Sequence, residues 1–459
     1  MDKRSLFLSD FIKKELELQL FDLTIDGIVV YGFLCRELRK KYMQSYFPST
    51  DKDVLLLKKK SSLKYTIISF LQILKLSVIN KRIDNFVYSF YRVDKVGDMF
   101  LDKFTDPLID NSSIKKSYII FEKSNNFEHK KPRLHSSKLV YTDYIEQKAI
   151  KYAKNNKDSF ILRYKNELEL LWRKLDLLMG EVPYSKDWTV IRLLRDKSMM
   201  DFYHSFFIKH NIKRFIAPCR AVFLPHMYVC KELNIPVLEL QHGLNFGMGS
   251  ITCLGYRDYH FVPDNFLSFE EKLQRERYGV ENSRVINIGW AFSDYIKGKI
   301  SDYEIKSNQV LVITTMSVDS LFRFIEKLAH NFPMIEFHIR LHPLARMTEK
   351  AQKIVKENKN IELRDNTINI YVELSRYRMV IGDNSTVLVE ALGNGKKVGR
   401  ICYDDMIPIY YNNEEKDAEW EISDIDSFKR FLESPIIDNF GFKLYSPFNS
   451  ASLEEVLKQ

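Results

Sequence analysis

The sequence predicts an α/β protein made of two Rossmann-like units, with a helix-rich N-terminal region before them. In the second half of the chain, short apolar runs alternate with helical patterns, and polar clusters follow several of the apolar runs. The length of 459 residues favours two domains, since one hydrophobic core rarely grows beyond roughly 300 residues. We expect an N-terminal, acceptor-side domain over 1–295 and a C-terminal, nucleotide-binding domain over 296–459.

The composition is that of a globular protein. Hydrophobic residues make up 45% and charged residues 29%, and Gly and Pro are sparse, which excludes disordered, collagenous and low-complexity classes. The five cysteines are an odd number and form no CxxC pair, which argues against a disulfide framework or a zinc knuckle and fits a reducing compartment. They are Cys35, Cys219, Cys230, Cys253 and Cys402.

The N-terminal residues mix acids with apolar side chains and lack the apolar core of a signal peptide, so we expect a cytoplasmic protein. The most apolar stretch, 65–79, is too short to span a bilayer and contains Lys75. Because it follows Lys58, Lys59, Lys60 and Lys64 in a chain of net charge +9, it could rest on the inner face of the cytoplasmic membrane. The pattern favours a buried helix with solvated flanks.

Residues 1–150 are the least readable part of the chain. Residues 9–10 could cap a helix, 26–27 predict a turn, and the X-Pro pairs at 106–107 and 131–132 mark breaks. From 143 to 178 apolar positions recur among charges at helical spacing, which predicts helix before the first Rossmann-like unit.

The two βα series follow in order, joined by a polar, charged link near 297–308. The first series has expected strands at 214–217, 236–240, 259–262 and 284–288, with a helix at 222–233. The second has expected strands at 310–313, 335–341, 361–363, 379–381 and 398–402, with helices at 320–329, 370–375 and 387–392.

Four polar clusters stand directly after predicted strands. In open α/β sheets ligands bind beyond the carboxyl ends of the strands, so these clusters are the first candidates for a site. They are Gln241-His242-Gly243, Thr314-Thr315-Met316-Ser317, Arg340-Leu341-His342-Pro343 and Asp383-Asn384-Ser385-Thr386.

The last cluster precedes a helical run, which would place hydroxyls and free backbone N–H groups at a helix N-terminus that favours phosphate. An ordinary N-cap made of Ser385 is the alternative. Glu390 falls one turn later and could accept hydrogen bonds from ribose hydroxyls, or be a solvated glutamate. His342 at a strand end could hydrogen-bond or protonate a leaving phosphate, with Arg340 adding charge. Gly243 would let the backbone approach a ligand closely.

Taken together, LELQHG at 238–243, HIRLHP at 338–343 and IGDNSTVLVEALGNGKKV at 381–398 resemble bacterial surface-polysaccharide glycosyltransferases of the GT-B architecture. This group includes the capsule enzymes that transfer Kdo and sialic acid, and the resemblance covers about 214–405. It implies two facing Rossmann-like domains. It also implies metal-independent transfer of a sugar from a CMP- or UDP-linked donor to a growing polysaccharide or a lipid-linked acceptor.

Carried over by position, the resemblance implies that His342 contacts the donor phosphate, that Ser385 and Thr386 bind phosphate oxygens, and that Glu390 faces the ribose. The acidic base of some related enzymes has no fixed position here, so His242 is the base candidate, unless a carboxylate before residue 240 does that work. The nucleotide-binding candidates also include Thr315, Ser317, Arg340 and Pro343, and the strand-end loops add Gln241, Gly243, Asp383 and Asn384.

Three other functions stay open. A CDP-polyol phosphotransferase of the teichoic-acid type and a non-hydrolysing sugar-nucleotide epimerase are similar in architecture, and a basic RNA-contacting protein ranks last because the 32 Phe and 25 Tyr follow the apolar runs. The DxD spacing at 51–53 has no strand before it, and no phosphate-binding GxxxxGK[ST] loop or GxGxxG fingerprint occurs. We therefore expect no metal, no cofactor and no nucleic-acid partner.

Overall fold

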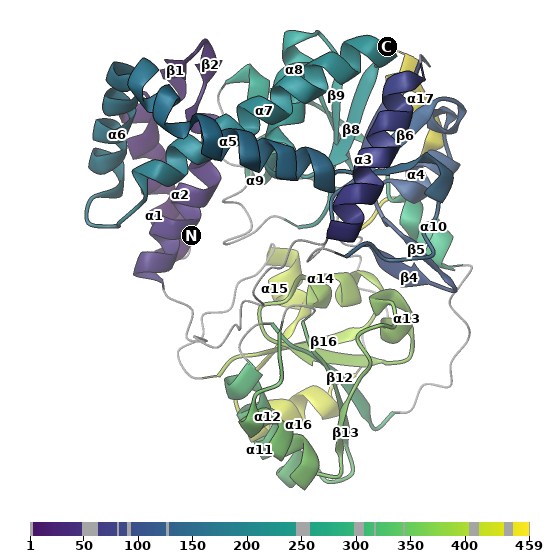
Figure 1. The fold of residues 1–459 in the computed structure, drawn as a ribbon. Helices are drawn as coiled ribbons and strands as arrows, with labels where there is room; N and C mark the ends of the chain where they lie inside the picture. The colour runs from purple at the N-terminus through teal and green to yellow at the C-terminus, as the bar shows by residue number, and fades with distance from the viewer. Residues whose placement is uncertain are drawn as a thin grey trace.

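A computed structural model describes most of the chain. The described residues are 3–47, 63–79, 82–89, 93–124, 128–244, 258–297, 307–315, 318–342, 345–403, 413–435 and 444–458. Two parallel sheets, of seven and six strands, lie one in each half of the molecule, with helices packed on them (Figure 1). This arrangement confirms the predicted α/β class with two Rossmann-like domains.

The first sheet has the strand order β11-β10-β9-β8-β3-β6-β7, and every neighbouring pair is parallel. Its strands are almost continuously apolar and mostly buried, as strands covered on both faces require. Three of the seven strands come from the first 150 residues, where the sequence pattern predicts no strands. The strands are β3 (Asn85–Ser89), β6 (Tyr118–Glu122), β7 (Leu139–Tyr141), β8 (Arg214–Pro218), β9 (Val237–Leu240), β10 (Asn265–Ser268) and β11 (Arg284–Asn287).

Helices of the N-terminal half form a layer beside and over this sheet (Figure 1). The helix predicted over 143–178 is confirmed, as two helices that meet at Tyr164. The helices are α1 (Lys3–Glu17), α2 (Tyr31–Tyr46), α3 (Leu63–Val78), α4 (Asp106–Asp110), α5 (Asp143–Arg163), α6 (Lys165–Met179), α7 (Lys186–His210), α8 (Leu224–Glu232), α9 (Arg275–Tyr278) and α10 (Ala291–Lys297).

Three local predictions are corrected. Residues 9–10 lie inside α1 and do not cap it. Residues 259–262 are not a strand, because the Asp258 carboxylate accepts a hydrogen bond from the His260 backbone N–H and starts a 3-10 turn; the strand begins after it, at Asn265. The apolar stretch of α3 is a helix but not a buried one, since Ser69 is its one buried residue. The turn at 26–27 is confirmed, with both residues at positive φ between β1 (Thr24–Ile25) and β2 (Ile28–Val29).

The second sheet has the order β14-β13-β12-β15-β16-β17, again all parallel. Its strands are β12 (Gln309–Ile313), β13 (Glu336–Arg340), β14 (Ile361–Leu363), β15 (Met379–Gly382), β16 (Lys397–Ile401) and β17 (Trp420–Ile422). Its helices are α11 (Val318–Asn331), α12 (Glu349–Glu357), α13 (Ile370–Ser375), α14 (Thr386–Gly393), α15 (Asn413–Ala418) and α16 (Ile425–Glu433). The second predicted βα series is thus present in order.

Contacts join the two halves of the chain at several places. A short hairpin of β4 (Asp94–Val96) and β5 (Met99–Leu101) leads to Lys103, whose Nζ lies 5.5 Å from the ring centre of Tyr371 in the second domain. The last helix, α17 (Ser450–Lys458), returns to the first domain, where the Glu454 carboxylate accepts hydrogen bonds from the backbone N–H and hydroxyl of Ser113 at 2.6 Å each. The C-terminal segment therefore packs on the domain in which the chain begins.

Candidate functional site

The register of the second sheet places its predicted site residues along one edge. Arg340, Ile313, Gly382 and Arg400 pair in a row across β13, β12, β15 and β16, at the carboxyl ends of these strands. The polar residues that follow each strand must therefore share this edge. They are Thr314 and Thr315 after β12, His342 after β13, Asp383 to Ser385 after β15, and Tyr403 after β16.

Two strand ends in this row lie so close together that position 382 requires glycine. A Cβ on Gly382 would lie 2.5 Å from the carbonyl oxygen of Ile313, which is shorter than real Cβ contacts. Glycine at this position thus lets the β15 end lie against β12 and brings the segment after it beside Thr315.

Hydrogen bonds tie the segments of this edge together. Thr315 Oγ1 donates to Asp383 Oδ2 at 2.6 Å, and the Tyr403 hydroxyl donates to the same oxygen at 3.1 Å. Thr314 Oγ1 accepts the backbone N–H of His342 at 2.9 Å, which holds the start of the histidine loop. Three of the four predicted polar clusters therefore converge in one place.

Asp383 is the most enclosed carboxylate of this edge. Burial raises its pKa, against the hydrogen bonds from Thr315 and Tyr403, which lower it. Its second oxygen, Oδ1, is buried and has no hydrogen-bond partner among the described residues. A buried acceptor without a partner is costly, so a ligand donor or a proton on this carboxyl would satisfy it.

The start of α14 has the geometry of a capped helix. Ser385 Oγ accepts the Val387 backbone N–H at 3.3 Å, so this serine is the N-cap, as the plainer of its two interpretations held. Thr386 is exposed in the first turn. Asn384 Oδ1 accepts from Arg400 Nη1 at 3.3 Å, and Arg400 is itself paired with buried Glu419. The N-cap arrangement leaves the hydroxyl protons of Ser385 and Thr386 available to a ligand.

Arg340 is the cation of this edge. Its Nη2 donates to the Ile368 carbonyl at 2.6 Å, while its Nη1 is buried without a partner among the described residues. Burial lowers its pKa, and the nearby Glu373 and Asp94 act in the opposite direction. An anionic group would both satisfy Nη1 and offset the burial of the charge.

Glu390 lies where the two domains meet. It accepts a hydrogen bond from the Tyr371 hydroxyl at 2.5 Å. Burial raises its pKa, and the positive charge of Lys103 from the first domain lowers it. The ring of Tyr371 also packs against Trp290, with ring centres 5.2 Å apart. Glu390 is therefore a half-buried interdomain residue and not a solvated helix glutamate.

The fourth predicted cluster ends β9 in the first sheet. Gln241 is buried and uses both ends of its amide, accepting the Phe269 N–H at 3.0 Å and donating to the Tyr278 hydroxyl at 2.8 Å and to Glu270. Burial raises the pKa of Glu270 to about 7, although the hydrogen bonds from Tyr278 and Gln241 lower it. His242 is half-buried beside this cluster, and the space at the Gly243 Cα is open. Gln241 thus has a structural role, joining β9 to β10.

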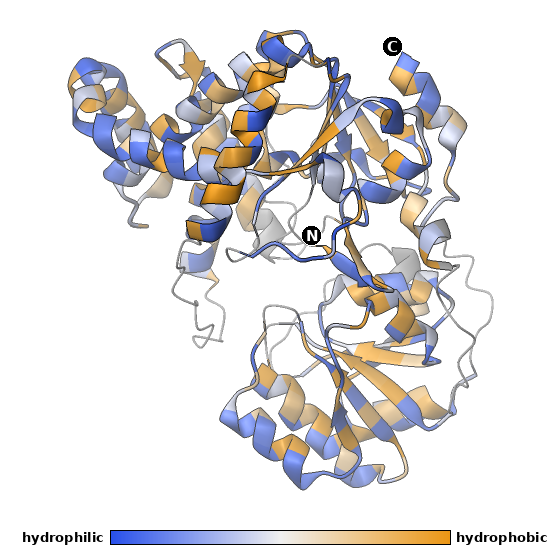
Figure 2. Ribbon diagram, turned by 45° about the vertical axis from the view of Figure 1, so that its right-hand side comes forward, coloured by the Kyte–Doolittle hydropathy of each residue, from blue (hydrophilic) through white to orange (hydrophobic). Residues whose placement is uncertain are grey.

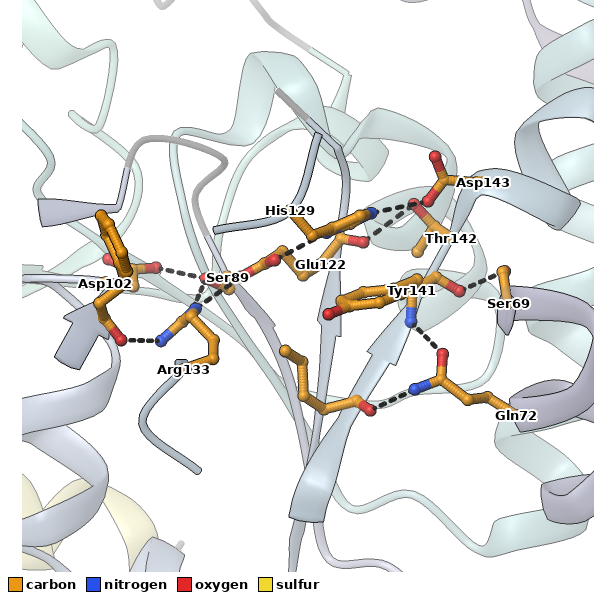
Figure 3. Close-up of polar contacts among 12 residues, drawn as sticks. Ser69, Gln72, Ser89, Asp102, Glu122, His129, Arg133, Tyr141, Thr142 and Asp143 are labelled. Carbon is orange, nitrogen blue, oxygen red and sulfur yellow. Dashed lines mark hydrogen bonds and ion pairs between the residues drawn. The ribbon is translucent and has the colours of Figure 1, made fainter. Parts of the chain in front are cut away.

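A second polar network occupies the same edge of the first sheet, at the ends of β3, β6 and β7 (Figure 3). The ring of His129 bridges two carboxylates, with Nδ1 2.8 Å from Glu122 and Nε2 2.8 Å from Asp143. Burial alone would lower the pKa of His129, but the hydrogen bonds to Asp143 and Glu122 raise it overall. The imidazolium form is therefore stabilised inside the fold.

Arg133 extends this network toward α4. Its guanidinium donates to Glu122 at 2.8 Å and to the Ser89 hydroxyl at 3.0 Å (Figure 3). It also donates to Asp106 at 2.5 Å. Burial raises the pKa of Asp106 to about 7, although Arg133 lowers it. These side chains are almost wholly enclosed, so their role is to hold three strand ends in position. The sequence alone does not identify this network, because it shows that these residues are acidic or basic but not that they lie together.

Some predicted site residues lie outside the part of the chain that the structure describes. They are Ser317 and Pro343; the Asp51-Lys52-Asp53 triplet, at which no metal site is expected, also lies outside the described residues. Within the described ranges, no group of three or more His, Cys, Asp or Glu residues could hold a metal ion. His342 and His242 are both half-buried, one at the edge of each sheet.

Comparison with known proteins finds similarity at the level of three-dimensional structure. No family model and no curated protein matches the chain. Solved structures similar to 82% of the chain include UDP-GlcNAc 2-epimerases from Methanocaldococcus jannaschii (12% identity, 98% of that chain, TM-score 0.46) and from Neisseria meningitidis bound to UDP-GlcNAc (14%, 100%, 0.44). MurG of Acinetobacter baumannii is also similar (9% identity, 82% of this chain and 98% of that chain, TM-score 0.41). The assignment of two Rossmann-like domains rests on the strand orders given above.

Proposed function

We propose that this chain is an enzyme that acts on a nucleotide-activated sugar and binds the nucleotide phosphates at the carboxyl edge of the second sheet. The observation that carries the proposal is the pair of buried, unpartnered polar atoms there, Arg340 Nη1 and Asp383 Oδ1. They stand at the ends of strands in the same sheet as the capped start of α14. A phosphate needs N–H and O–H donors and a cation, and a ribose offers hydroxyls to a carboxylate.

The chemistry of such a site follows from its residue types. Negative charge that develops on a leaving phosphate would be stabilised by the Arg340 guanidinium and by the hydroxyls of Ser385 and Thr386. The imidazole of His342 would donate a hydrogen bond or a proton to the same oxygen. These groups supply charge stabilisation without a metal ion, and we propose a metal-independent reaction.

The finer proposal is transfer of the sugar from a CMP- or UDP-linked donor to a growing surface polysaccharide or a lipid-linked acceptor. It rests on the motifs at 238–243, 338–343 and 381–398 and on His242, which stands at the edge of the first sheet and is the candidate base. An imidazole is the side chain that most often accepts a proton from a reacting hydroxyl in enzymes.

A second candidate is epimerisation of the sugar while it stays on its nucleotide. This reaction removes a proton from a sugar carbon and returns one to the other face, so it needs acid and base groups that titrate near neutral pH. The observation that favours it is Glu270, whose pKa of about 7 comes from burial and which receives a hydrogen bond from Gln241, next to His242.

Two experiments test the proposal. Thermal stabilisation by UDP, CDP, CMP and GDP and their sugar conjugates, with and without EDTA, measures binding, because a ligand of the native state raises the melting temperature by mass action. We expect a shift with one nucleotide class that EDTA leaves unchanged. No shift with any nucleotide would contradict the proposed function, and a shift with CDP-glycerol or CDP-ribitol alone would favour polyol phosphotransfer.

A reaction with one sugar nucleotide then distinguishes sugar transfer from epimerisation. Incubation of the enzyme with UDP-GlcNAc alone, followed by NMR, yields an epimer if the second candidate is correct. A transferase releases nucleotide only when an acceptor is added. If the reaction is transfer, His342→Ala should lower turnover on the order of 100-fold without unfolding the protein, and retained activity would remove His342 from the mechanism.

A further inference from the structure

Helix α3 contacts the first domain through polar side chains and through Tyr65, Ile68, Ile73 and Leu76, which pack against its core. The Ser69 hydroxyl donates to the Tyr141 carbonyl at 2.5 Å and accepts the Tyr144 N–H at 3.1 Å. The Gln72 amide donates to the Leu139 carbonyl at 3.0 Å and accepts the Tyr141 N–H at 2.9 Å (Figure 3). Since β7 is the edge strand, Gln72 pairs with its backbone as a further strand would and covers the edge.

The opposite side of α3 carries large apolar side chains that are 40% to 79% exposed, although the ring of Phe70 lies against that of Tyr144, with ring centres 5.0 Å apart. Their spacing of three and four residues places them on one stripe over four turns of the helix. Figure 2 shows this helix on the outside of the upper domain, with hydrophobic residues along its length. The stripe consists of Leu63 (73% exposed), Ile67 (50%), Phe70 (40%), Leu71 (56%), Leu74 (48%) and Val78 (79%).

Helix α3 is therefore apolar on both sides, whereas a surface helix usually keeps polar residues on its outward face. Single exposed apolar residues are ordinary, but a contiguous stripe of six large ones marks an interaction surface. Ser69 and Gln72 face inward because they hydrogen-bond with the edge strand. The described part of the fold does not explain why six large apolar residues face outward.

The charges that α3 itself carries are positive. Helix α3 contains no acidic residue, and its two lysines, Lys64 and Lys75, are exposed. At the C-terminal end of the helix, Lys209 Nζ donates to the Ser77 carbonyl. Shortly after the helix, Arg82 borders a surface hollow of about 690 Å³ in which cations outnumber acids. The charged residues that line the hollow are Arg82, Lys116, Lys213, Arg214 and Asp84.

We propose that the α3 stripe docks the protein on the surface of an anionic lipid bilayer. The helix would lie in the plane of the interface, with Phe70 and the leucines at the boundary of the acyl chains and the lysines among the headgroup phosphates. At about 1.5 Å per residue, the 16 residues of α3 span about 24 Å, which suits a helix lying on the membrane, and no helix in the described part of the chain is long and apolar enough to cross one. This inference does not depend on the proposed function.

A second copy of the chain is a poorer occupant of the stripe. In a two-fold contact between two α3 helices, the stripes would face each other and bring the flanking lysines of both helices together, and the absence of acids on α3 means that no ion pair between the two helices could offset this repulsion. Anionic lipid supplies the missing charge.

The test is sedimentation of the full-length protein with vesicles of phosphatidylcholine alone or with about 25% phosphatidylglycerol. The proposal predicts binding to the anionic vesicles that weakens as salt is raised. The variant Leu71→Gln/Leu74→Gln should bind about 100-fold less tightly, since each leucine loses roughly tenfold in partitioning. Lys64→Gln/Lys75→Gln should lower binding to anionic vesicles about tenfold and leave neutral vesicles unaffected.

A matched control changes two exposed leucines that lie elsewhere on helices. Leu162 on α5 and Leu177 on α6 are 80% and 58% exposed, so Leu162→Gln/Leu177→Gln removes at least as much exposed apolar surface outside the stripe as the stripe variant removes within it. This variant should bind vesicles like the unmodified protein. Equal binding by the stripe variant, or no binding by the unmodified protein, overturns the proposal.

Two further results would also overturn it and would identify what covers the stripe. A concentration-dependent dimer in light scattering that disappears in the Leu71→Gln/Leu74→Gln variant would show a second copy of the chain. A melting temperature lowered by the same substitutions, without vesicle binding, would show that the chain covers the stripe itself. The nucleotide-induced thermal shift is measured in parallel, so failure of the docking proposal is distinguishable from failure of the proposed function.

Discussion

Replacing Arg340 by methionine separates the affinity of the proposed phosphate site from the stability of the fold. In the free protein the substitution removes one hydrogen bond, from Nη2 to the Ile368 carbonyl, which is worth about 1 to 2 kcal/mol. It also removes a guanidinium whose charge burial disfavours, and methionine keeps the apolar stem. These effects oppose each other, so we expect the free energy of unfolding to change by no more than about 1 kcal/mol.

In the complex with nucleotide, the substitution would also remove a contact with the ligand. A charge-assisted hydrogen bond from Nη1 to a phosphate oxygen contributes about 1.5 to 3 kcal/mol, so its loss should weaken binding about 10- to 150-fold. Arg340→Lys keeps the positive charge but loses the planar guanidinium, so its nucleotide affinity should lie between those of the unmodified protein and Arg340→Met.

Isothermal titration calorimetry with the nucleotide that gives the largest thermal shift measures this change, and urea unfolding measures stability. Arg364→Met is the matched control, because Arg364 pairs with Glu373 at 2.9 Å and Glu362 at 2.6 Å inside the same domain. It should cost stability through the buried Glu373 carboxylate and leave nucleotide affinity unchanged. Unchanged affinity in Arg340→Met would refute the assignment of the phosphate site to this edge.

Three further predictions concern the fold around the two sheet edges. Burial raises the pKa of Glu270 to about 7, so the stability that its neutral form supports is full in acid and is lost as pH rises through 7. Glutamine stays neutral at all pH values. Between pH 5 and 8, the free energy of unfolding of Glu270→Gln in urea should therefore rise by up to about 3 kcal/mol relative to that of the unmodified protein. Gly382→Ala should destabilise the second domain by about 1 to 3 kcal/mol, because its Cβ meets the Ile313 carbonyl, and a melting temperature equal to that of the unmodified protein would contradict the close approach. Gln72→Leu should cost about 1 to 3 kcal/mol and speed hydrogen exchange at the Tyr141 amide, which loses its acceptor; unchanged exchange there would mean that water replaces the side chain.

The second domain could be predicted closely from the sequence. Its strands are short, buried and apolar, and each ends at polar residues, so the expected strand at 310–313 corresponds to β12 and that at 379–381 to β15. The rule that ligands bind at carboxyl ends then selects the segments that Thr315 and Asp383 join. Local pattern suffices here because each strand is followed by its own helix.

The first domain could not be predicted in the same way. Strands β3, β6 and β7 are separated by a hairpin, by α4 and by loops, so the alternation of strand and helix is interrupted between 85 and 141. The network of Glu122, His129 and Arg133 depends on loop positions that no spacing encodes. For α3 the periodicity indicates a helix but does not say which face is inward, and the edge of β7 decides it in favour of Ser69 and Gln72.

The two sheets present the same kind of edge but differ in how their polar groups are satisfied, and this difference favours the second sheet as the place of the proposed ligand. On the first sheet Glu122 and Gln241 use both of their polar atoms within the protein. Asp106 keeps one oxygen without a described partner, but its pKa of about 7 lets it hold a proton there. On the second sheet Arg340 keeps a buried N–H that a proton cannot satisfy, and an unused cationic donor calls for an anion. A nucleotide phosphate at this edge would complete the hydrogen bonding that the chain leaves open, whereas at the first edge it would have to displace bonds already made.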